Sequence, residues 1–252
     1  MKDEIVKFFP DAELISEDEV GQQYMVSFDG KSFWLAVPND RKLNDLHFVF
    51  IFCGRGGAGS RNAFTAGEIP GKVLNMLLKD GFAFICAVCS PDAWADMEST
   101  QMTFDTWEYC RKQGLNIPEK IDLFGGSMGG LGALIFASRK VGMVRKIVEL
   151  FGITDLDDFY NCGNYREALG QLTAEERQDR SPCRKLDCYK DVDILIIHGT
   201  EDTIVDISYS ERFYKLLKER NYSCQYISVP GIGHDNNILG KVDKDIHDFL
   251  IK

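Results

Sequence analysis

Residues 120–140 read KIDLFGGSMGGLGALIFASRK, and two patterns meet within this stretch. A β-branched and aromatic run at 121–124 leads into a serine flanked by glycines, and an apolar helical pattern follows at once. Glycines on both sides of Ser127 allow a tight strand-to-helix turn that exposes the serine hydroxyl at its apex. The stretch therefore predicts a buried strand, a strained turn and a helix.

Short apolar runs of the same kind recur along the chain. They read HFVFIFCG, FAFICAVC, VRKIVELFG and VDILIIHG, with YSCQYISVP as a further strand. Strict alternation is lost in the first four, which is typical of parallel strands buried on both faces. Helical patterns fall between the runs, for example at 209–217 and 238–250. Helices are therefore expected on both faces of the sheet.

The N-terminal part has a different pattern, GQQYMVSFDGKSFWLAVP at residues 21–38. Apolar residues alternate on both sides of Asp29-Gly30, a dipeptide that favours a two-residue hairpin turn. The whole sequence thus predicts an α/β fold with a mostly parallel central sheet and an antiparallel N-terminal hairpin.

A chain of 252 residues with 44% hydrophobic content can build one sizeable core, so we expect a single domain over residues 1–252. Residues 155–190 are long for a connection between a strand and a helix. We interpret them as a small lid insertion over the strand ends. Within them, EALGQLTAEERQDRSP predicts a helical stretch that breaks at Pro182.

Composition excludes several classes of partner. Lys plus Arg is 29 and Asp plus Glu is 39, which gives a net charge of −10 without any basic run. Nucleic acid and anionic membranes are therefore not expected as partners. We find no secretion signal and no membrane-span pattern, and expect a cytoplasmic protein with free thiols. Cys183 and Cys188 lack the spacing of a zinc site, so no metal is expected.

The serine turn, GGSMG, fits the pattern G-x-S-x-G. A structural or phosphate-binding turn would also fit it. A serine nucleophile needs a base, and the chain has four histidines. His234 lies in VPGIGHDN, a loop just after the last strand, where it can reach Ser127. His198 ends a strand and is interpreted as a packed, hydrogen-bonded residue.

The base in turn needs a carboxylate that orients it. The segment HGTEDTIVD offers Asp202 directly after a strand, while Asp206 is better placed to cap the next helix. Asp155 is a second candidate. The chain order Ser127, Asp202, His234 is the order that the serine motif requires.

An oxyanion site needs backbone donors. The N–H of Met128 lies at a helix start, and FIFCGRGGAGS supplies a second donor from Arg55 or Gly56. The Arg55 guanidinium is predicted either to bind a substrate carboxylate or to pair with a surface acid. Trp94 is expected either to line the substrate pocket or to cover the helix layer.

These segments resemble the α/β-hydrolase family of serine hydrolases over residues 47–252. GGSMGG, HGTEDTIV and GIGH carry the resemblance, which is strongest to prolyl-oligopeptidase-type catalytic domains and related small esterases. It implies Ser127 as nucleophile, Asp202 as orienting acid and His234 as base. Many esterases of the fold carry His-Gly-Gly-Gly where this chain reads Cys-Gly-Arg-Gly at 53–56.

The resemblance implies an α/β-hydrolase fold and hydrolysis of carboxylic esters through an acyl-enzyme on Ser127, without a cofactor. The peptidases carry a large N-terminal domain, whereas about 45 residues precede the matching core here. That favours a small-molecule ester over a peptide. A prolyl-oligopeptidase-like peptidase or acyl-aminoacyl hydrolase is the enzymatic alternative. A binding protein on a hydrolase scaffold is the non-enzymatic one.

Overall fold

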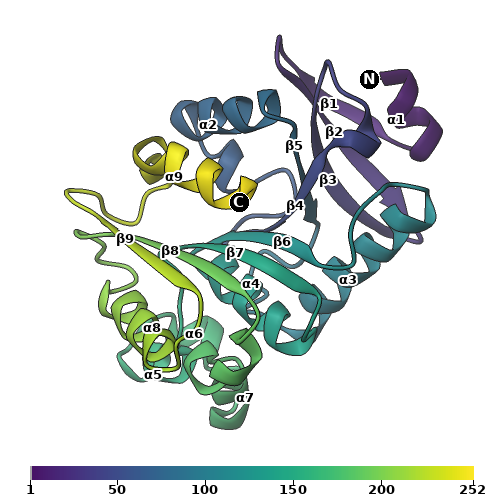
Figure 1. The fold of residues 1–252 in the computed structure, drawn as a ribbon. Helices are drawn as coiled ribbons and strands as arrows, with labels where there is room; N and C mark the ends of the chain where they lie inside the picture. Colours follow the sequence, from purple (N-terminus) through teal and green to yellow (C-terminus); the bar gives the residue numbers. More distant parts are fainter. Residues whose placement is uncertain (1) are drawn as a thin grey trace.

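One sheet organises the part of the chain that the computed structural model describes, residues 2–252 (Figure 1). Its nine strands follow the order β1-β2-β3-β5-β4-β6-β7-β8-β9. Pairing is antiparallel from β1 to β5 and parallel from β5 to β9. The strands are β1 Glu13–Glu17, β2 Gly21–Phe28, β3 Lys31–Pro38, β4 His47–Phe52, β5 Phe82–Ala87, β6 Ile121–Gly126, β7 Val144–Leu150, β8 Asp193–Gly199 and β9 Cys224–Val229.

The antiparallel edge contains the predicted hairpin. Strands β2 and β3 pair from Gly21↔Pro38 to Phe28↔Lys31. Asp29 and Gly30 both have positive φ, 47° and 72°, as the mirror-image hairpin turns require. Strand β1 adds to this edge and was not predicted, because its five residues are all exposed and give no apolar alternation.

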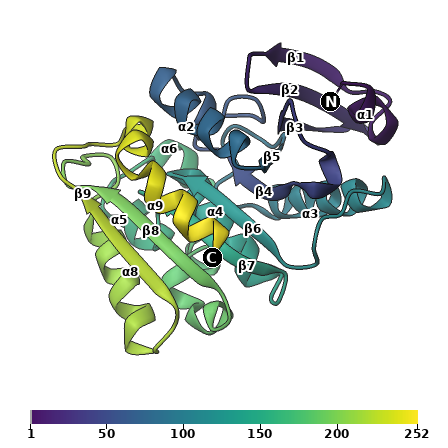
Figure 2. The same ribbon diagram turned by 45° about the horizontal axis from the view of Figure 1, so that its top comes forward.

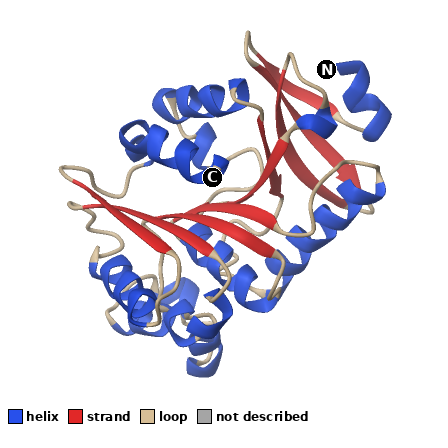
Figure 3. Cartoon of the chain, in the orientation of Figure 1, coloured by secondary structure: helices blue, strands red, loops and turns tan. Residues whose placement is uncertain are grey.

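Helices cover both faces of the sheet (Figures 2 and 3). Helices α2 and α9 share one apolar cluster with the sheet, and α1, α3, α4 and α8 contribute to the cluster on the other face. The helices are α1 Lys2–Phe8, α2 Glu68–Lys79, α3 Met97–Lys112, α4 Met128–Arg139, α5 Leu156–Asn161, α6 Arg166–Leu169, α7 Ala174–Asp179, α8 Ser208–Glu219 and α9 Leu239–Ile251. This arrangement confirms the predicted fold class.

Short helices, α5 to α7, fill the long segment 155–190. The helical stretch predicted before Pro182 is divided into α6 and α7, because a capping box between Thr173 and Glu176 starts a new helix at Ala174. Apolar residues of the segment form a third cluster with α4 and the start of α8. The segment therefore packs beside the strand ends through its own small core.

Strand β4 lies between β5 and β6, so the chain order diverges on its two sides. Ligands of open α/β sheets bind at such a switch point, outside the carboxyl ends of the strands. The loops after β4 and β6 meet there. Within residues 2–252, none of the helices combines the length and the apolar character that a membrane crossing needs.

Candidate active site

Ser127 lies at the sharp turn between β6 and α4. Its backbone has φ 57° and ψ −125°, a conformation that residues other than glycine rarely adopt. A Cβ on Gly129 would lie 2.1 Å from the Phe52 carbonyl oxygen, and one on Gly125 would lie 2.2 Å from the Gly129 carbonyl oxygen. The glycines thus let α4 pass directly against β4, which holds Ser127 in its strained position.

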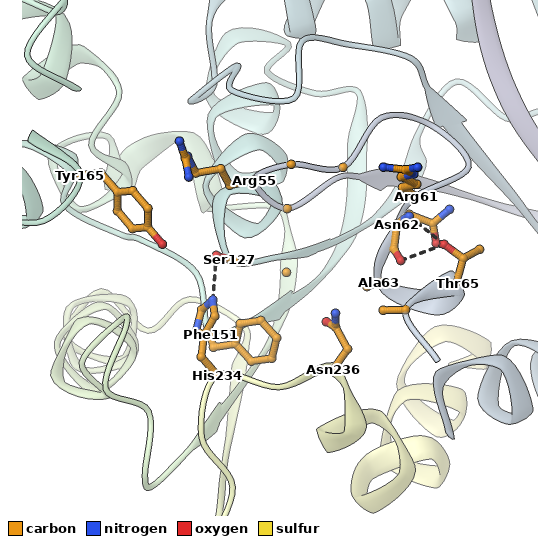
Figure 4. Close-up of a pocket in the computed structure, with 15 residues that line it drawn as sticks. Arg55, Arg61, Asn62, Ala63, Thr65, Ser127, Phe151, Tyr165, His234 and Asn236 are labelled. Atoms are coloured by element: carbon orange, nitrogen blue, oxygen red, sulfur yellow. Dashed lines mark hydrogen bonds between the residues drawn. The ribbon is translucent and has the colours of Figure 1, made fainter. Parts of the chain in front are cut away.

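Ser127, His234 and Asp202 form one hydrogen-bonded chain. The Nε2 atom of His234 is 2.9 Å from Ser127 Oγ, and its Nδ1 atom is 2.6 Å from Asp202 Oδ2 (Figure 4 shows the first contact). Because an ionised carboxylate only accepts, Nδ1 carries the proton and Nε2 accepts from the serine hydroxyl. The arrangement can pass the hydroxyl proton to the imidazole when an electrophile binds.

Asp202 is held in place by backbone N–H groups as well as by His234. Its Oδ1 atom accepts the N–H groups of Ile204 and Val205, both at 2.9 Å, and its side chain is fully buried. Burial alone would raise its pKa. Hydrogen bonds from His198, His234 and the backbone outweigh burial and hold the pKa of Asp202 well below its ordinary value. The carboxylate is therefore ionised and faces the imidazole at neutral pH.

His198 supports the same carboxylate from behind. Its Nε2 atom is 2.9 Å from the Val205 carbonyl oxygen and 3.3 Å from Asp202 Oδ2. Its Nδ1 atom is 2.7 Å from Ser210 Oγ. Burial lowers the pKa of His198, but Asp202, Glu149 and the Val205 carbonyl together raise it above its ordinary value. His198 is thus packed and hydrogen-bonded, away from the serine.

The other candidates from the sequence lie in separate networks. Asp155 caps α5 and contacts Arg212 at 3.2 Å. Asp206 accepts the Ser208 N–H at the start of α8. The two remaining histidines pair with other acids: His47 with Asp122, and His247 with Asp80. None of these groups contacts the Ser127 hydroxyl in the described chain.

Two backbone N–H groups near Ser127 are candidates to bind an oxyanion. The N–H of Met128 starts α4 and has no acceptor within its own helix. The N–H of Gly56 donates to the Pro91 carbonyl at 2.7 Å, which leaves Arg55 as the candidate donor from the loop after β4. A Cβ on Gly54 would lie 3.9 Å from Ser127 Cβ, so this loop runs directly beside the serine.

A cavity of about 460 Å³ opens over Ser127 and His234 (Figure 4). Residues 54–66 form much of its wall, together with residues at the ends of β6 and β7 and in the loop after β9. Phe151 lies against the His234 ring, with the two ring centroids 4.5 Å apart. The lining is Gly54, Arg55, Gly56, Gly57, Arg61, Asn62, Ala63, Thr65, Ala66, Gly126, Ser127, Phe151, Tyr165, His234 and Asn236.

Arg55 lines this cavity and is paired with an acid. Its Nε atom is 2.9 Å from Asp92 Oδ1, and its guanidinium lies over the Tyr165 ring, 5.1 Å from the centroid. Trp94 donates from its indole nitrogen to the same Asp92 oxygen at 2.6 Å. It is only 4% exposed and, among the described residues, does not line the cavity. Tyr165 lies against Trp94, with ring centroids 5.2 Å apart, and is itself part of the cavity wall.

Sequence reasoning missed Tyr165, Arg61 and Asn236. Tyr165 has φ 45° and precedes α6, and Figure 4 shows its hydroxyl directed toward Ser127. Arg61 follows the glycine-rich loop, and Asn236 comes two residues after His234. Proximity in sequence could have drawn attention to Asn236, whereas no pattern marks Tyr165. Within residues 2–252, no group of three or more His, Cys, Asp or Glu side chains could hold a metal ion.

Comparison with known sequences finds a matching family and a matching protein. The sequence profile of the prolyl oligopeptidase family matches residues 94–252. The uncharacterized protein YfhR of Salmonella typhimurium is 24% identical over 204 residues, which cover 78% of this chain and 68% of that protein.

Solved structures show the same architecture. A truncated form of a carbohydrate esterase from gut microbiota superimposes with a TM-score of 0.73 at 21% identity, covering 95% of this chain and 98% of that one. The acylaminoacyl peptidase of Pyrococcus horikoshii gives a TM-score of 0.73 at 19% identity, covering 93% of this chain and 42% of that one. Likeness at these identities shows a shared fold.

Proposed function

Because the chain belongs to the prolyl oligopeptidase family of serine hydrolases and has the α/β-hydrolase fold, we propose that it is a carboxylic ester hydrolase with Ser127 as nucleophile. One observation carries the proposal. A serine hydroxyl, an imidazole and a buried carboxylate lie in one hydrogen-bonded chain at the floor of an open cavity. This is the arrangement that activates a hydroxyl for acyl transfer.

In the first step Ser127 Oγ attacks the ester carbonyl carbon while its proton moves to His234 Nε2. The carbonyl π electrons move to oxygen, and the N–H groups of Met128 and Arg55 stabilise the resulting oxyanion. The tetrahedral species then collapses and breaks the bond to the alcohol oxygen. That oxygen takes the proton from His234, so the alcohol leaves neutral and an acyl-enzyme remains.

A water molecule completes the reaction. His234 accepts a proton from the water as its oxygen attacks the acyl carbon, and the oxyanion forms against the same two backbone donors. Collapse breaks the bond to Ser127 Oγ, which regains its proton from His234 and releases the acid. Asp202 keeps the His234 proton on Nδ1 throughout and stabilises the transient imidazolium.

Two observations support an ester rather than a peptide bond. A carbohydrate esterase from gut microbiota is among the solved structures that share this fold. The cavity is also open to solvent, so a small ester has direct access to Ser127. The family profile keeps a peptidase or acyl-aminoacyl hydrolase as the second candidate.

Hydrolysis of p-nitrophenyl esters from acetate to octanoate tests the proposal. We expect Ser127→Ala to lower kcat by about 10⁴-fold or more, since the nucleophile is lost while the oxyanion donors remain. Ser138→Ala, near the end of α4, is the matched control and should retain both turnover and labelling by a fluorophosphonate. Labelling of the Ser127→Ala variant at wild-type level contradicts the proposed nucleophile.

Matched acyl groups separate the two enzymatic candidates. An aminoacyl p-nitrophenyl ester and the corresponding p-nitroanilide share the acyl group and differ in the bond that breaks. We expect turnover of the ester and at most trace turnover of the anilide. Clear Ser127-dependent turnover of the anilide favours the peptidase instead.

A further inference from the structure

The cavity wall differs in charge from the rest of the chain. The chain carries 39 acidic and 29 basic residues, a net charge of −10. The described residues that line the cavity nevertheless include two arginines and neither Asp nor Glu. Charges beyond about 8 Å are screened at physiological ionic strength, so the field that a bound substrate experiences depends mainly on the charged groups at and beside the wall. The cavity lining is thus basic on a protein whose net charge is negative.

The two arginines of the wall are not equivalent. Arg55 is paired with Asp92 at 2.9 Å and stacked over Tyr165, so its charge is compensated. The Arg61 guanidinium makes neither a hydrogen bond nor an ion pair with any residue between 2 and 252. It lies at the end of the cavity away from Tyr165, with Ser127 between them in Figure 4. The uncompensated positive charge of the wall therefore belongs to Arg61.

The loop that carries Arg61 is held in place by its neighbours. Asn62 accepts the Phe64 N–H at 3.0 Å and donates to the Gly59 carbonyl at 3.0 Å. Thr65 accepts the Asn62 N–H at 2.9 Å, which closes a capping box. The side chains of Asn62 and Thr65 are thus engaged within the loop, and the Arg61 backbone has a fixed position beside the cavity.

One more polar group lines the cavity. Asn236 follows His234 by two residues, and its amide has no hydrogen-bond partner in the described structure. Arg61 presents a planar guanidinium fork, and Asn236 presents an amide N–H₂ at a separate place on the wall (Figure 4). A carboxylate accepts a forked guanidinium through two parallel hydrogen bonds. A single uncompensated charge also matches a monoanion better than a phosphate dianion.

We propose that Arg61 binds a carboxylate of the substrate and makes the enzyme selective for anionic esters over neutral esters of the same size. This inference rests on the proposed esterase function and adds a substrate class to it. The ester carbonyl meanwhile lies at Ser127, between this carboxylate and Tyr165.

Paired esters that differ only in one charge test the inference. 4-Acetoxybenzoate and 4-acetoxybenzamide differ on the alcohol side, and 4-nitrophenyl hydrogen adipate and 4-nitrophenyl adipamate differ on the acyl side. The readout is the ratio of kcat/KM for the anionic and the neutral ester of each pair. We expect a ratio of at least about ten in one pair, and that pair shows which side of the ester faces Arg61.

Substitution assigns the selectivity to Arg61. Arg61→Gln should lower that ratio about tenfold, while Arg61→Lys, which keeps the charge and loses the fork, should retain part of it. Arg220→Gln is the matched control, because this substitution removes the same charge. Arg220 lies just before β9 and does not line the cavity among the described residues. Raising NaCl from 20 to 500 mM should lower the wild-type ratio and leave the ratio of Arg61→Gln almost unchanged.

The outcomes separate this inference from the function on which it rests. Wild-type ratios near one in both pairs, or a ratio that Arg61→Gln leaves intact, overturn the role of Arg61. Ester turnover that still depends on Ser127 preserves the esterase in that case. Failure of the wild type to hydrolyse any of the four esters overturns both. Circular dichroism of each variant checks that the exposed substitutions leave the fold intact.

Discussion

The two walls of the cavity are built in different ways. The strand-end wall consists of Ser127, Phe151 and His234, with Asp202 behind them. The loop wall consists of Arg55, Arg61, Tyr165 and Asn236. Along the strand-end wall every reacting side chain already has a partner, and the Asp202 side chain is 0% exposed. The loop wall is more open, with the Arg55 side chain 47% exposed.

The difference separates the chemistry from recognition. Groups that stabilise a transition state act best when their geometry is fixed before the substrate arrives. Groups that select a substrate gain by being left unpaired until it binds, since a wrong substrate then leaves them unsatisfied. On the strand-end wall the hydrogen bonds are internal to the protein. On the loop wall Arg61, Asn236 and the Tyr165 hydroxyl have no partner within the described residues.

Apart from the loss of Ser127 itself, the largest effect is expected where the strand-end wall is broken at Asp202. In Asp202→Asn the amide no longer stabilises an imidazolium, and it can donate to His234 Nδ1 and hold the ring in the wrong tautomer. We expect kcat to fall by about 10⁴-fold, with a much smaller change in KM. Steady-state kinetics with the best p-nitrophenyl ester measure the changes in kcat and KM separately.

A second acid of the same turn provides the control. Asp206 accepts the Ser208 N–H and lies four residues beyond Asp202. Asp206→Asn should leave kcat within a few-fold of the wild-type value, because asparagine caps a helix start about as well. Equal losses of kcat in the two variants contradict the role assigned to Asp202.

A buried acid lies under the strand-end wall. Glu149, at the end of β7, is 0% exposed, and a Cβ on Gly130 would lie 2.9 Å from its Oε1 atom. Oε1 accepts the Gly152 N–H, while Oε2 has no partner among the described residues. Burial raises the pKa of Glu149 from 4.5 to about 7, although His198 opposes the shift. Ionisation of this group therefore opposes folding.

Glu149→Gln should remove that penalty. Below pH 4.5 the acid is neutral in both the folded and the unfolded protein, so burial of a charge costs nothing. As pH rises from 4.5 through about 7, the unfolded protein loses its proton first and wild-type stability falls. We expect Glu149→Gln to gain about 3 kcal/mol in unfolding free energy, relative to the wild type, between pH 4 and pH 8.5.

Urea unfolding at the two pH values measures the change, with Glu219→Gln as the control. Glu219 is the last residue of α8 and is exposed. The control substitution should shift stability equally at both pH values. A pH-independent effect of Glu149→Gln contradicts the raised pKa, because the substitution then changes stability without removing the cost of a buried charge.

The strand-end wall is also the part that sequence reasoning placed in advance. The central parallel strands are short runs buried on both faces, and Ser127 and Asp202 follow two of them closely, whereas His234 follows the partly exposed edge strand β9. Carboxyl ends of parallel strands lie at one edge, so strand recognition alone brings the three residues near one another. The order of the strands in the sheet could not be predicted, because the sequence of each run does not indicate which strands lie beside it.

The residues of the loop wall could not be predicted from the sequence, for a physical reason. Tyr165 reaches the cavity because 155–190 packs a small core against α4, a long-range contact without local periodicity. Arg55 and Arg61 are six residues apart in one glycine-rich loop, and only the position of Asp92 shows which charge is compensated. Strand β1 was missed because none of its residues is buried.

The smallest effect is expected on the loop wall at Tyr165. Tyr165→Phe keeps the ring, so the contacts with Trp94 and with the Arg55 guanidinium remain, and only the hydroxyl is lost. Because that hydroxyl is directed toward Ser127 in Figure 4, we expect it to hydrogen-bond the bound ester. Its removal should raise KM about fivefold, the equivalent of roughly 1 kcal/mol, with kcat within a factor of two.

Tyr160→Phe is the matched control, since Tyr160 belongs to the same segment and its ring lies under Arg177, 3.9 Å from the guanidinium carbon. Among the described residues it does not line the cavity, and the substitution should leave KM unchanged. A loss confined to kcat in Tyr165→Phe instead assigns the hydroxyl to the transition state. The division between the two walls then fails at this residue, because a group of the loop wall would act in the chemical step.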